Sequence, residues 1–193
     1  MEAAGDLIWE SGYGATSVDD ICRKADVRKG SFYHFFNSKA DLEVAVLEAQ
    51  WAQNRQKLDG IFSPSVPPLK RLEKFFDHVN AGQAGMQTEC GSVLGCPLFT
   101  IGSEVCAHEP AIREKVQEVL NTYVQYFESA IRDADAAGLI NAPDAKAKAR
   151  ILFAYFQGTL THARIENSLE PLRGLKDGAF ALLGVNRLEP ATA

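Results

Sequence analysis

Residues 16–42 read TSVDDICRKADVRKGSFYHFFNSKADL, and this stretch decides how the N-terminal part of the chain folds. Its apolar residues recur at three- and four-residue steps in segments 17–25 and 28–36, which is the spacing of helices. The tight segment Ala25-Asp26-Val27 lies where the two helices meet. The run Thr16-Ser17-Val18-Asp19 is expected to form the capping box at the start of the first helix. Two short helices joined by so tight a turn predict a helix-turn-helix.

The second of these helices is expected to have two different sides. At about 100° per residue, three phenylalanines share one arc and should pack against the rest of the domain: Phe32, Phe35 and Phe36. The other side carries small and hydrogen-bonding side chains: Gly30, Ser31 and His34, with Tyr33 at its border. Such a side suits the major groove of DNA, where base edges offer hydrogen-bond donors and acceptors.

The local charge agrees with this interpretation. Between residues 21 and 40, Asp26 is the single acidic residue among five basic ones: Arg23, Lys24, Arg28, Lys29 and Lys39. Phosphates attract such a patch, and binding should weaken steeply with salt. The formal net charge of the whole chain is −5, which argues against a histone-like protein that coats nucleic acid. It does not exclude a local basic patch.

The stretch from Thr16 to Leu42, and most closely residues 27–39, resembles the TetR family of repressors. The resemblance is close over the N-terminal helices, and the rest of the chain matches by architecture. It implies phosphate contacts by Thr16, Tyr33 and Lys39. It also implies base or phosphate contacts from the recognition helix by Arg28, Ser31 and His34. Lys29 belongs to the same basic patch, and Gly30 would let the backbone approach a phosphate closely.

The remainder of the chain also reads as helices, so the expected fold class is all-α. Further helices are expected near 68–82, 97–107, 110–137, 144–168 and 175–185. Pro64, Pro67 and Pro68 interrupt the chain after a helix that begins near residue 38. The predicted organisation is a three-helix helix-turn-helix domain over residues 1–47 and a helical ligand-binding and dimerisation domain over residues 48–193.

The two long helices, 110–137 and 144–168, carry apolar residues at helical steps. The resemblance implies that they pair with their copies as a four-helix bundle in a homodimer. The candidate interface residues are Leu120, Phe127, Phe153, Phe156, Gly158 and Leu160. The alternative is that they form only the core of one chain. A two-fold dimer would place its recognition helices about 34 Å apart, to read a palindrome in double-stranded DNA.

The expected effector site lies in the C-terminal domain. Phe99, Tyr123 and Phe127 are candidates to line a cavity, and the competing interpretation of each is ordinary core. In Gly95-Cys96-Pro97, the proline suits the first position inside a helix and so puts Cys96 at the N-cap. A helix N-terminus lowers the pKa of a thiol and makes it more reactive. The competing interpretation of Cys96 is a small core residue.

Residues 95–106 and Glu170-Pro171-Leu172 are also similar to those TetR-family repressors that control N-ethylmaleimide reductase. That subgroup senses electrophiles and oxidants through cysteine, and the resemblance places Cys96 at its reactive position. On one intact helix Cys96 and Cys106 would lie about 15 Å apart. A disulfide needs Cα atoms within about 7 Å, so no bridge between them is expected unless the helix unwinds. Cys90 or a partner subunit would be a better second thiol.

Other classes of function are weaker. The sequence holds no Gly-rich phosphate loop, H-E-x-x-H or nucleophile elbow, so no enzyme is expected. Cys90, Cys96, Cys106 and His108 fit no compact zinc spacing, and neither a metal nor another cofactor is expected. No apolar run is long enough to span a membrane, and a reducing cytoplasm is the expected compartment. The alternative function is a helical scaffold or interaction protein that has lost DNA binding, since the first helix is acidic.

The sequence thus predicts a DNA-binding transcriptional regulator. The expected mechanism is repression, relieved when a small hydrophobic or electrophilic effector releases the protein from its palindromic operator, with Cys96 as the candidate point of action.

Overall fold

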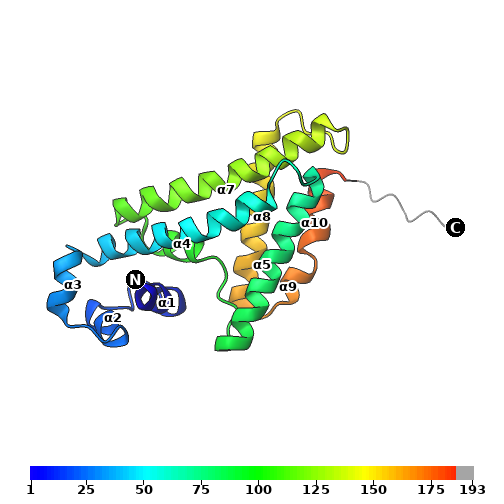
Figure 1. The fold of residues 1–193 in the computed structure, drawn as a ribbon. Helices are drawn as coiled ribbons and strands as arrows, with labels where there is room; N and C mark the ends of the chain where they lie inside the picture. The colour runs from blue at the N-terminus through cyan, green and yellow to red at the C-terminus, as the bar shows by residue number, and fades with distance from the viewer. Residues whose placement is uncertain (186–193) are drawn as a thin grey trace. The chain divides into compact units, whose positions relative to one another are not determined.

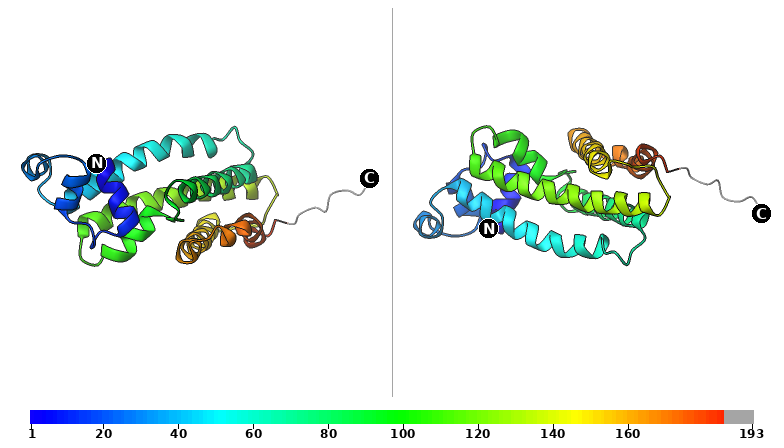
Figure 2. Two further views of the ribbon diagram at one scale, coloured as in Figure 1. Left: turned by 90° about the horizontal axis from the view of Figure 1, so that it is seen from below. Right: turned by 90° about the horizontal axis from the view of Figure 1, so that it is seen from above.

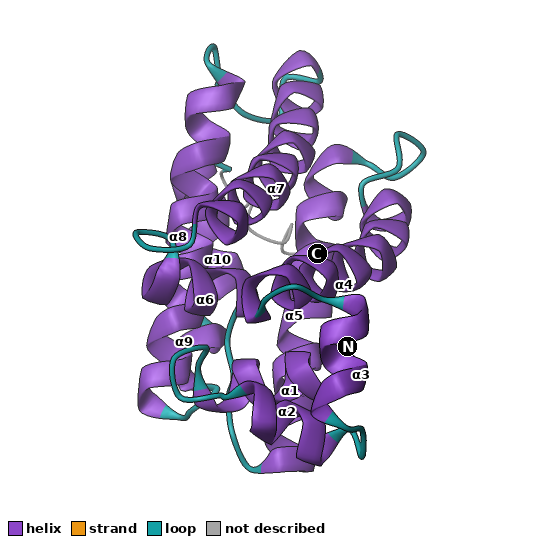
Figure 3. Cartoon of the chain, turned by 90° about the vertical axis from the view of Figure 1, so that its left-hand side faces the viewer, coloured by secondary structure: helices purple, strands orange, loops and turns teal. Residues whose placement is uncertain are grey.

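The computed structural model describes residues 1–185, and this part of the chain consists of ten helices joined by turns and loops (Figure 1). The helices are α1 (Glu2–Ser11), α2 (Val18–Lys24), α3 (Lys29–Phe35), α4 (Lys39–Ile61), α5 (Pro68–Cys90), α6 (Pro97–Val105), α7 (Pro110–Ala136), α8 (Ala145–Glu166), α9 (Glu170–Arg173) and α10 (Leu175–Leu183). The described residues contain no strand (Figure 3). The all-α prediction is therefore confirmed.

Local sequence explains where most helices begin and end. Prolines occupy the first position of α5, α6 and α7, where the missing N–H costs no hydrogen bond. The Asp144 side chain accepts a hydrogen bond from the backbone N–H of Ala147 and so caps α8. Asn167 ends α8 in the left-handed conformation, with φ of 48°. The expected helix bounds hold within a few residues, except that α5 runs on to Cys90 and α9 was not foreseen.

The chain folds as two compact units, and α4 and α7 contribute residues to both. The first unit comprises Met1–Lys57 and Leu94–Asn121. It contains α1, α2, α3 and α6, and its buried residues include Ile8, Ile21 and Leu42. The second unit comprises Leu58–Val93 together with residues 122–185 of the described chain. The domain boundary that the sequence predicts at residue 47 and the boundary between the units at Lys57 both fall within α4.

The second unit has an aromatic core. Phe75 is central, with its ring centroid 5.0 Å from that of Phe127 and 5.1 Å from that of Phe156. In both views of Figure 2, α8, α9 and α10 lie beside one another at the C-terminal end of the described chain. No helix in residues 1–185 is both long enough and apolar enough to cross a membrane.

A buried arginine fixes the loop before α5 in this unit. Arg71 is 3% exposed and donates hydrogen bonds to the Asp133 carboxylate and to the carbonyls of Val66 and Pro64. A buried guanidinium needs such partners because its desolvation is costly. Arg71 therefore ties the proline-containing loop to α7.

Candidate nucleic-acid interface

The helix-turn-helix begins at a capping box one residue later than the sequence suggested. Ser17, not Thr16, is the N-cap of α2, and its hydroxyl oxygen accepts a hydrogen bond from the backbone N–H of Asp20 at 3.1 Å. The Asp20 carboxylate accepts the backbone N–H of Ser17 in return at 3.0 Å. The prediction of a Thr16–Asp19 box was wrong because Thr16 points inward, whereas Ser17 and Asp20 are paired at the surface.

The turn between α2 and α3 is held by backbone geometry. Asp26 adopts the left-handed conformation with φ of 52°, which Asp tolerates better than most residues. The backbone N–H of Val27 then donates to the carbonyl of Cys22 at 3.0 Å. This turn directs the chain from the end of α2 into α3.

Only part of the expected apolar side of α3 is buried. Phe32 is 6% exposed and Phe36 is half-buried, with ring centroids 5.8 Å apart. Phe35, in contrast, is 74% exposed. The prediction that all three phenylalanines anchor the helix was wrong for Phe35. The seven-residue helix rests on its neighbours along a narrow arc around Phe32, and Phe35 falls outside this arc.

The side chains that were expected to face DNA are uncovered in the described structure. Gly30, Ser31, Tyr33 and His34 are all exposed, and so are Arg28 and Lys29. Lys29 forms an ion pair with Asp19 at 2.9 Å, and this contact raises the pKa of Lys29. The outward side of α3 is therefore exposed and accessible to DNA.

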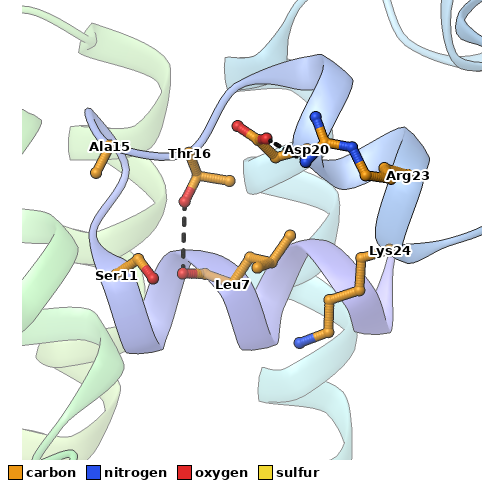
Figure 4. Close-up of a pocket in the computed structure, with 7 residues that line it drawn as sticks. All are labelled: Leu7, Ser11, Ala15, Thr16, Asp20, Arg23 and Lys24. Carbon is orange, nitrogen blue, oxygen red and sulfur yellow. Dashed lines mark hydrogen bonds and ion pairs between the residues drawn. The ribbon is translucent and has the colours of Figure 1, made fainter.

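Acidic neighbours partly compensate the basic patch. Arg23 lies 3.1 Å from Asp20, and Lys24 lies 3.7 Å from Asp6. Figure 4 shows Arg23 and Lys24 beside a groove between α1 and α2, into which Thr16 and Leu7 also face. The count of charged residues between 21 and 40 missed these carboxylates because they lie before residue 21.

Two of the residues implied as phosphate contacts are engaged within the chain instead. Thr16 is 3% exposed, and its hydroxyl donates to the carbonyl of Gly12 at 2.8 Å. The ammonium group of Lys39 donates to the carbonyls of Tyr13 and Thr16 and lies 3.8 Å from the centre of the Tyr13 ring. Burial lowers the pKa of Lys39. In this conformation both residues hold the turn before α2, and their contacts with phosphate stay a prediction.

Sequence analysis also missed a buried carboxyl group in the same unit. Glu43 on α4 is 3% exposed, and its Oε2 has no hydrogen-bond partner. Burial raises the pKa of Glu43 to about 8, although the charge of Lys39 opposes this shift. The group faces a cavity of about 10 Å³ between α1, α4 and α6. The sequence offered one sign of this burial, because Glu43 directly follows the buried Leu42 in an apolar part of α4.

The two candidate sensor cysteines, Cys96 and Cys106, flank α6. Cys96 is the N-cap of α6, as expected, and Cys106 is the C-cap. Both are half-buried, and burial raises the pKa of the Cys106 thiol. Because the helix between them is intact, the structure agrees with the prediction that they do not form a disulfide. The exposed Cys90 ends α5 in the other unit.

The candidate effector residues belong to different units of the chain. Phe99 belongs to α6 in the first unit, whereas Tyr123 and Phe127 belong to the second. Phe127 is fully buried in the aromatic core, and its role as an effector contact stays a prediction. Tyr123 is half-buried, and its ring stacks on that of Phe153 at 6.0 Å.

Most of the candidate dimer residues also lie in the interior. Four of them are at most 6% exposed in the single chain and so offer little surface to a partner: Phe127, Phe153, Phe156 and Leu160. Gly158 is exposed and Leu120 is half-buried. The apolar residues that α8 does expose were missed, namely Ile151 at 59% and Ile165 at 76%. Apart from Gly158, the candidates that helical periodicity selected on α8 therefore lie on its buried side.

Comparisons with known proteins fit this architecture. A family described as "Bacterial regulatory proteins, tetR family" matches residues 1–46, and "Tetracyclin repressor-like, C-terminal domain" matches residues 68–178. The Transcriptional regulator AcuR of Cereibacter sphaeroides is 34% identical over 176 residues, which are 89% of this chain and 78% of that protein. The HTH-type transcriptional repressor DhaR of a Mycobacterium species is 28% identical over 89% of this chain and 84% of its own length.

Solved structures agree in fold. Regulatory protein TetR from Rhodobacter sphaeroides superposes with a TM-score of 0.83 at 30% identity, covering 94% of this chain and 95% of that one. The reduced form of E. coli NemR has a TM-score of 0.82 at 21% identity, with 97% and 96% covered. The chain therefore belongs to the TetR family and is a DNA-binding transcriptional regulator.

Proposed function

We propose that this regulator is a repressor that binds a palindromic operator as a homodimer and reads base edges with the outward side of α3. The observation that carries the proposal is the exposure of Gly30, Ser31, Tyr33 and His34 on a helix anchored by Phe32. Arg28 and Lys29 at the start of the same helix would meet phosphates. The names of DhaR and NemR, both transcriptional repressors, support repression rather than activation.

The dimer interface that we propose uses the exposed side of α8 together with α10. On α8, Ile151, Gly158 and Ile165 recur at seven-residue steps and therefore share one face. A Cβ added at Gly158 would meet no atom within 4 Å, so another helix could approach closely there. Leu182 on α10 is 42% exposed and would extend the apolar surface. Burying such a surface against a second copy removes apolar area from water.

The test of base reading is operator binding by two histidine variants. His34→Ala should weaken binding to a palindrome from the protein's own promoter region by about tenfold or more, since one side-chain contact to a base contributes about 1–3 kcal/mol. His108→Ala is the matched control, because His108 is exposed but lies outside the helix-turn-helix. Fluorescence anisotropy at several salt concentrations measures both. If the wild-type protein shows no salt-dependent preference for any such palindrome, the scaffold function replaces the repressor function.

We further propose that an electrophilic effector acts on Cys96 and releases the protein from DNA. The support is the position of Cys96 at the N-terminus of α6, where the helix dipole favours a thiolate. Limiting maleimide at pH 7 should label Cys96 faster than the buried Cys22, as resolved by peptide mass spectrometry. The same treatment should weaken operator binding by the wild type but not by Cys96→Ser. Equal labelling of Cys96 and Cys22, or equal loss of binding by both proteins, contradicts the proposal.

A further inference from the structure

A carboxylate on α6 binds the turn that leads into the helix-turn-helix. The Glu104 side chain accepts two backbone N–H groups from consecutive residues, that of Tyr13 at Oε2 (2.9 Å) and that of Gly14 at Oε1 (2.6 Å). Both amides lie between α1 and α2. Hydrogen bonds to an ionised acceptor are stronger than neutral ones. Sequence separations of about ninety residues make this a tertiary contact and not a local cap.

The turn has the shape that this contact requires. Gly12 has φ of +95°, a conformation that side chains rarely allow. A Cβ added at Gly12 would lie 3.2 Å from Oε2 of Glu104, and one added at Gly14 would lie 3.0 Å from its Oε1. The two glycines therefore leave the space that the carboxylate occupies.

The carbonyl groups of the same turn are held from the opposite direction. Lys39 at the start of α4 donates to the carbonyls of Tyr13 and Thr16 at 2.7 and 2.9 Å. The phenol of Tyr13 donates to the Glu109 carboxylate at 3.2 Å, and burial raises the pKa of this phenol far above its usual value. Thus α6 holds the N–H groups of the turn while α4 holds its carbonyls. Ser17, the N-cap of α2, follows directly.

We propose that Glu104 is a positioning residue for operator binding, which fixes the start of α2 and thereby the direction in which α3 points. The connection is short at every step, because Ser17 follows the turn and α2 leads into α3 through only four residues. Glu104 need not touch DNA, since it acts through the backbone of Tyr13 and Gly14. The inference rests on the DNA contacts of α3 proposed above.

The central experiment compares Glu104→Gln with wild type in the full chain. The amide keeps the shape of the side chain but replaces one acceptor oxygen with a donor that cannot bind an N–H group. Operator binding at 25 °C should weaken by about tenfold, as expected for the loss of a charge-assisted hydrogen bond that acts on the bound geometry. Glu114→Gln is the matched control, because Glu114 is an exposed carboxylate on α7 of the same unit. It should bind the operator as wild type does.

A second measurement separates positioning from general stability. Amide hydrogen exchange at Tyr13 and Gly14 should be slow in wild type and in Glu114→Gln, and faster in Glu104→Gln, while the remaining core amides keep their protection. If Glu104→Gln fails to fold, Gly14→Ala serves instead, since its Cβ displaces the carboxylate and should weaken binding in the same direction. Unprotected Tyr13 and Gly14 amides in wild type, or a lowered melting temperature with unchanged operator affinity, would overturn the inference. Absence of operator binding by wild type would instead overturn the proposed function.

Discussion

The buried carboxyl of Glu43 makes the stability of the chain depend on pH. Its pKa in the folded chain is about 8, whereas its ordinary value is 4.5, and the cause is burial. Between these two values the folded chain keeps a proton that the unfolded chain has lost. Stability therefore falls as the pH rises through this window, by up to about 1.4 kcal/mol for each pH unit.

Replacing Glu43 by glutamine should remove this pH dependence. Glu43→Gln keeps a neutral group of the same shape, so its free energy of unfolding should approach that of wild type near pH 5 and exceed it increasingly up to pH 8. Urea denaturation at pH 5.5, 7.0 and 8.5 measures the difference. Glu10→Gln, an exposed change on α1 with the same loss of charge, is the control. A constant difference between Glu43→Gln and wild type at all three pH values would contradict the assignment.

Single residues show where sequence reasoning about the DNA-binding face succeeds and fails. The exposure of Ser31 and His34 followed from helical periodicity, because both lie about 100° or more from Phe32 around the helix. The exposure of Phe35 did not, because periodicity gives an angle but not the width of the surface that a short helix buries. The roles of Thr16 and Lys39 depend on a turn whose partner, Glu104, is distant in the sequence. Such contacts leave no local pattern.

At the scale of elements, α8 and α10 pack through a glycine that has no room for a side chain. A Cβ at Gly178 on α10 would lie 2.0 Å from the hydroxyl oxygen of Tyr155 on α8. Gly178→Ala must therefore move the tyrosine, and thermal unfolding should show a loss of about 1–3 kcal/mol. Gly82→Ala on α5 is the matched control, because open space surrounds Gly82. It should be neutral or stabilising by up to about 1 kcal/mol. If Gly178→Ala and Gly82→Ala changed the stability equally, α10 would be able to move away from Tyr155 without loss of folding free energy.

The exposed face of α8 gives a second prediction at this scale. Ile165→Lys places a charge on a side chain that is 76% exposed, so the folded monomer should tolerate it. In a dimer that buries this face, the charge would be desolvated, and sedimentation velocity should show a shift from dimer to monomer. Leu139→Lys, at a 47% exposed apolar residue beyond the end of α7, should leave the dimer intact. A dimer that survives Ile165→Lys would exclude this face as the interface.

The sequence predicted most helices because prolines, glycines and apolar periodicity are local properties. It could not predict which side of α8 faces its own core. Phe153 and Ile151 are both apolar and lie on the same helix, but Phe153 is buried by Tyr123 and Phe127 whereas Ile151 is exposed. Only the positions of the neighbouring helices separate a core residue from an interface residue.

At the scale of the whole molecule, two copies of α3 in a two-fold dimer should read two half-sites at a fixed separation. Recognition helices of such dimers lie about 34 Å apart, which is one turn of DNA. Five base pairs inserted between the half-sites rotate one of them by about half a turn, to the opposite face of the duplex. The helix-turn-helix of the second subunit then loses its contacts with DNA. Operator binding should weaken by about a hundredfold or more, because the advantage of a linked second site disappears.

Anisotropy titrations with the natural spacing and with five inserted base pairs measure this dependence in wild type and in Ile165→Lys. The two changes should not be additive, since a monomer binds each half-site separately and gains nothing from their spacing. Ile165→Lys should therefore bind both DNAs with the same weak affinity. If the wild-type protein binds both spacings equally, its two helix-turn-helix domains act independently. That result would contradict the proposal of repression through a rigid two-fold dimer. A spacing effect that persists in Ile165→Lys would place the dimer contact on another face of the chain.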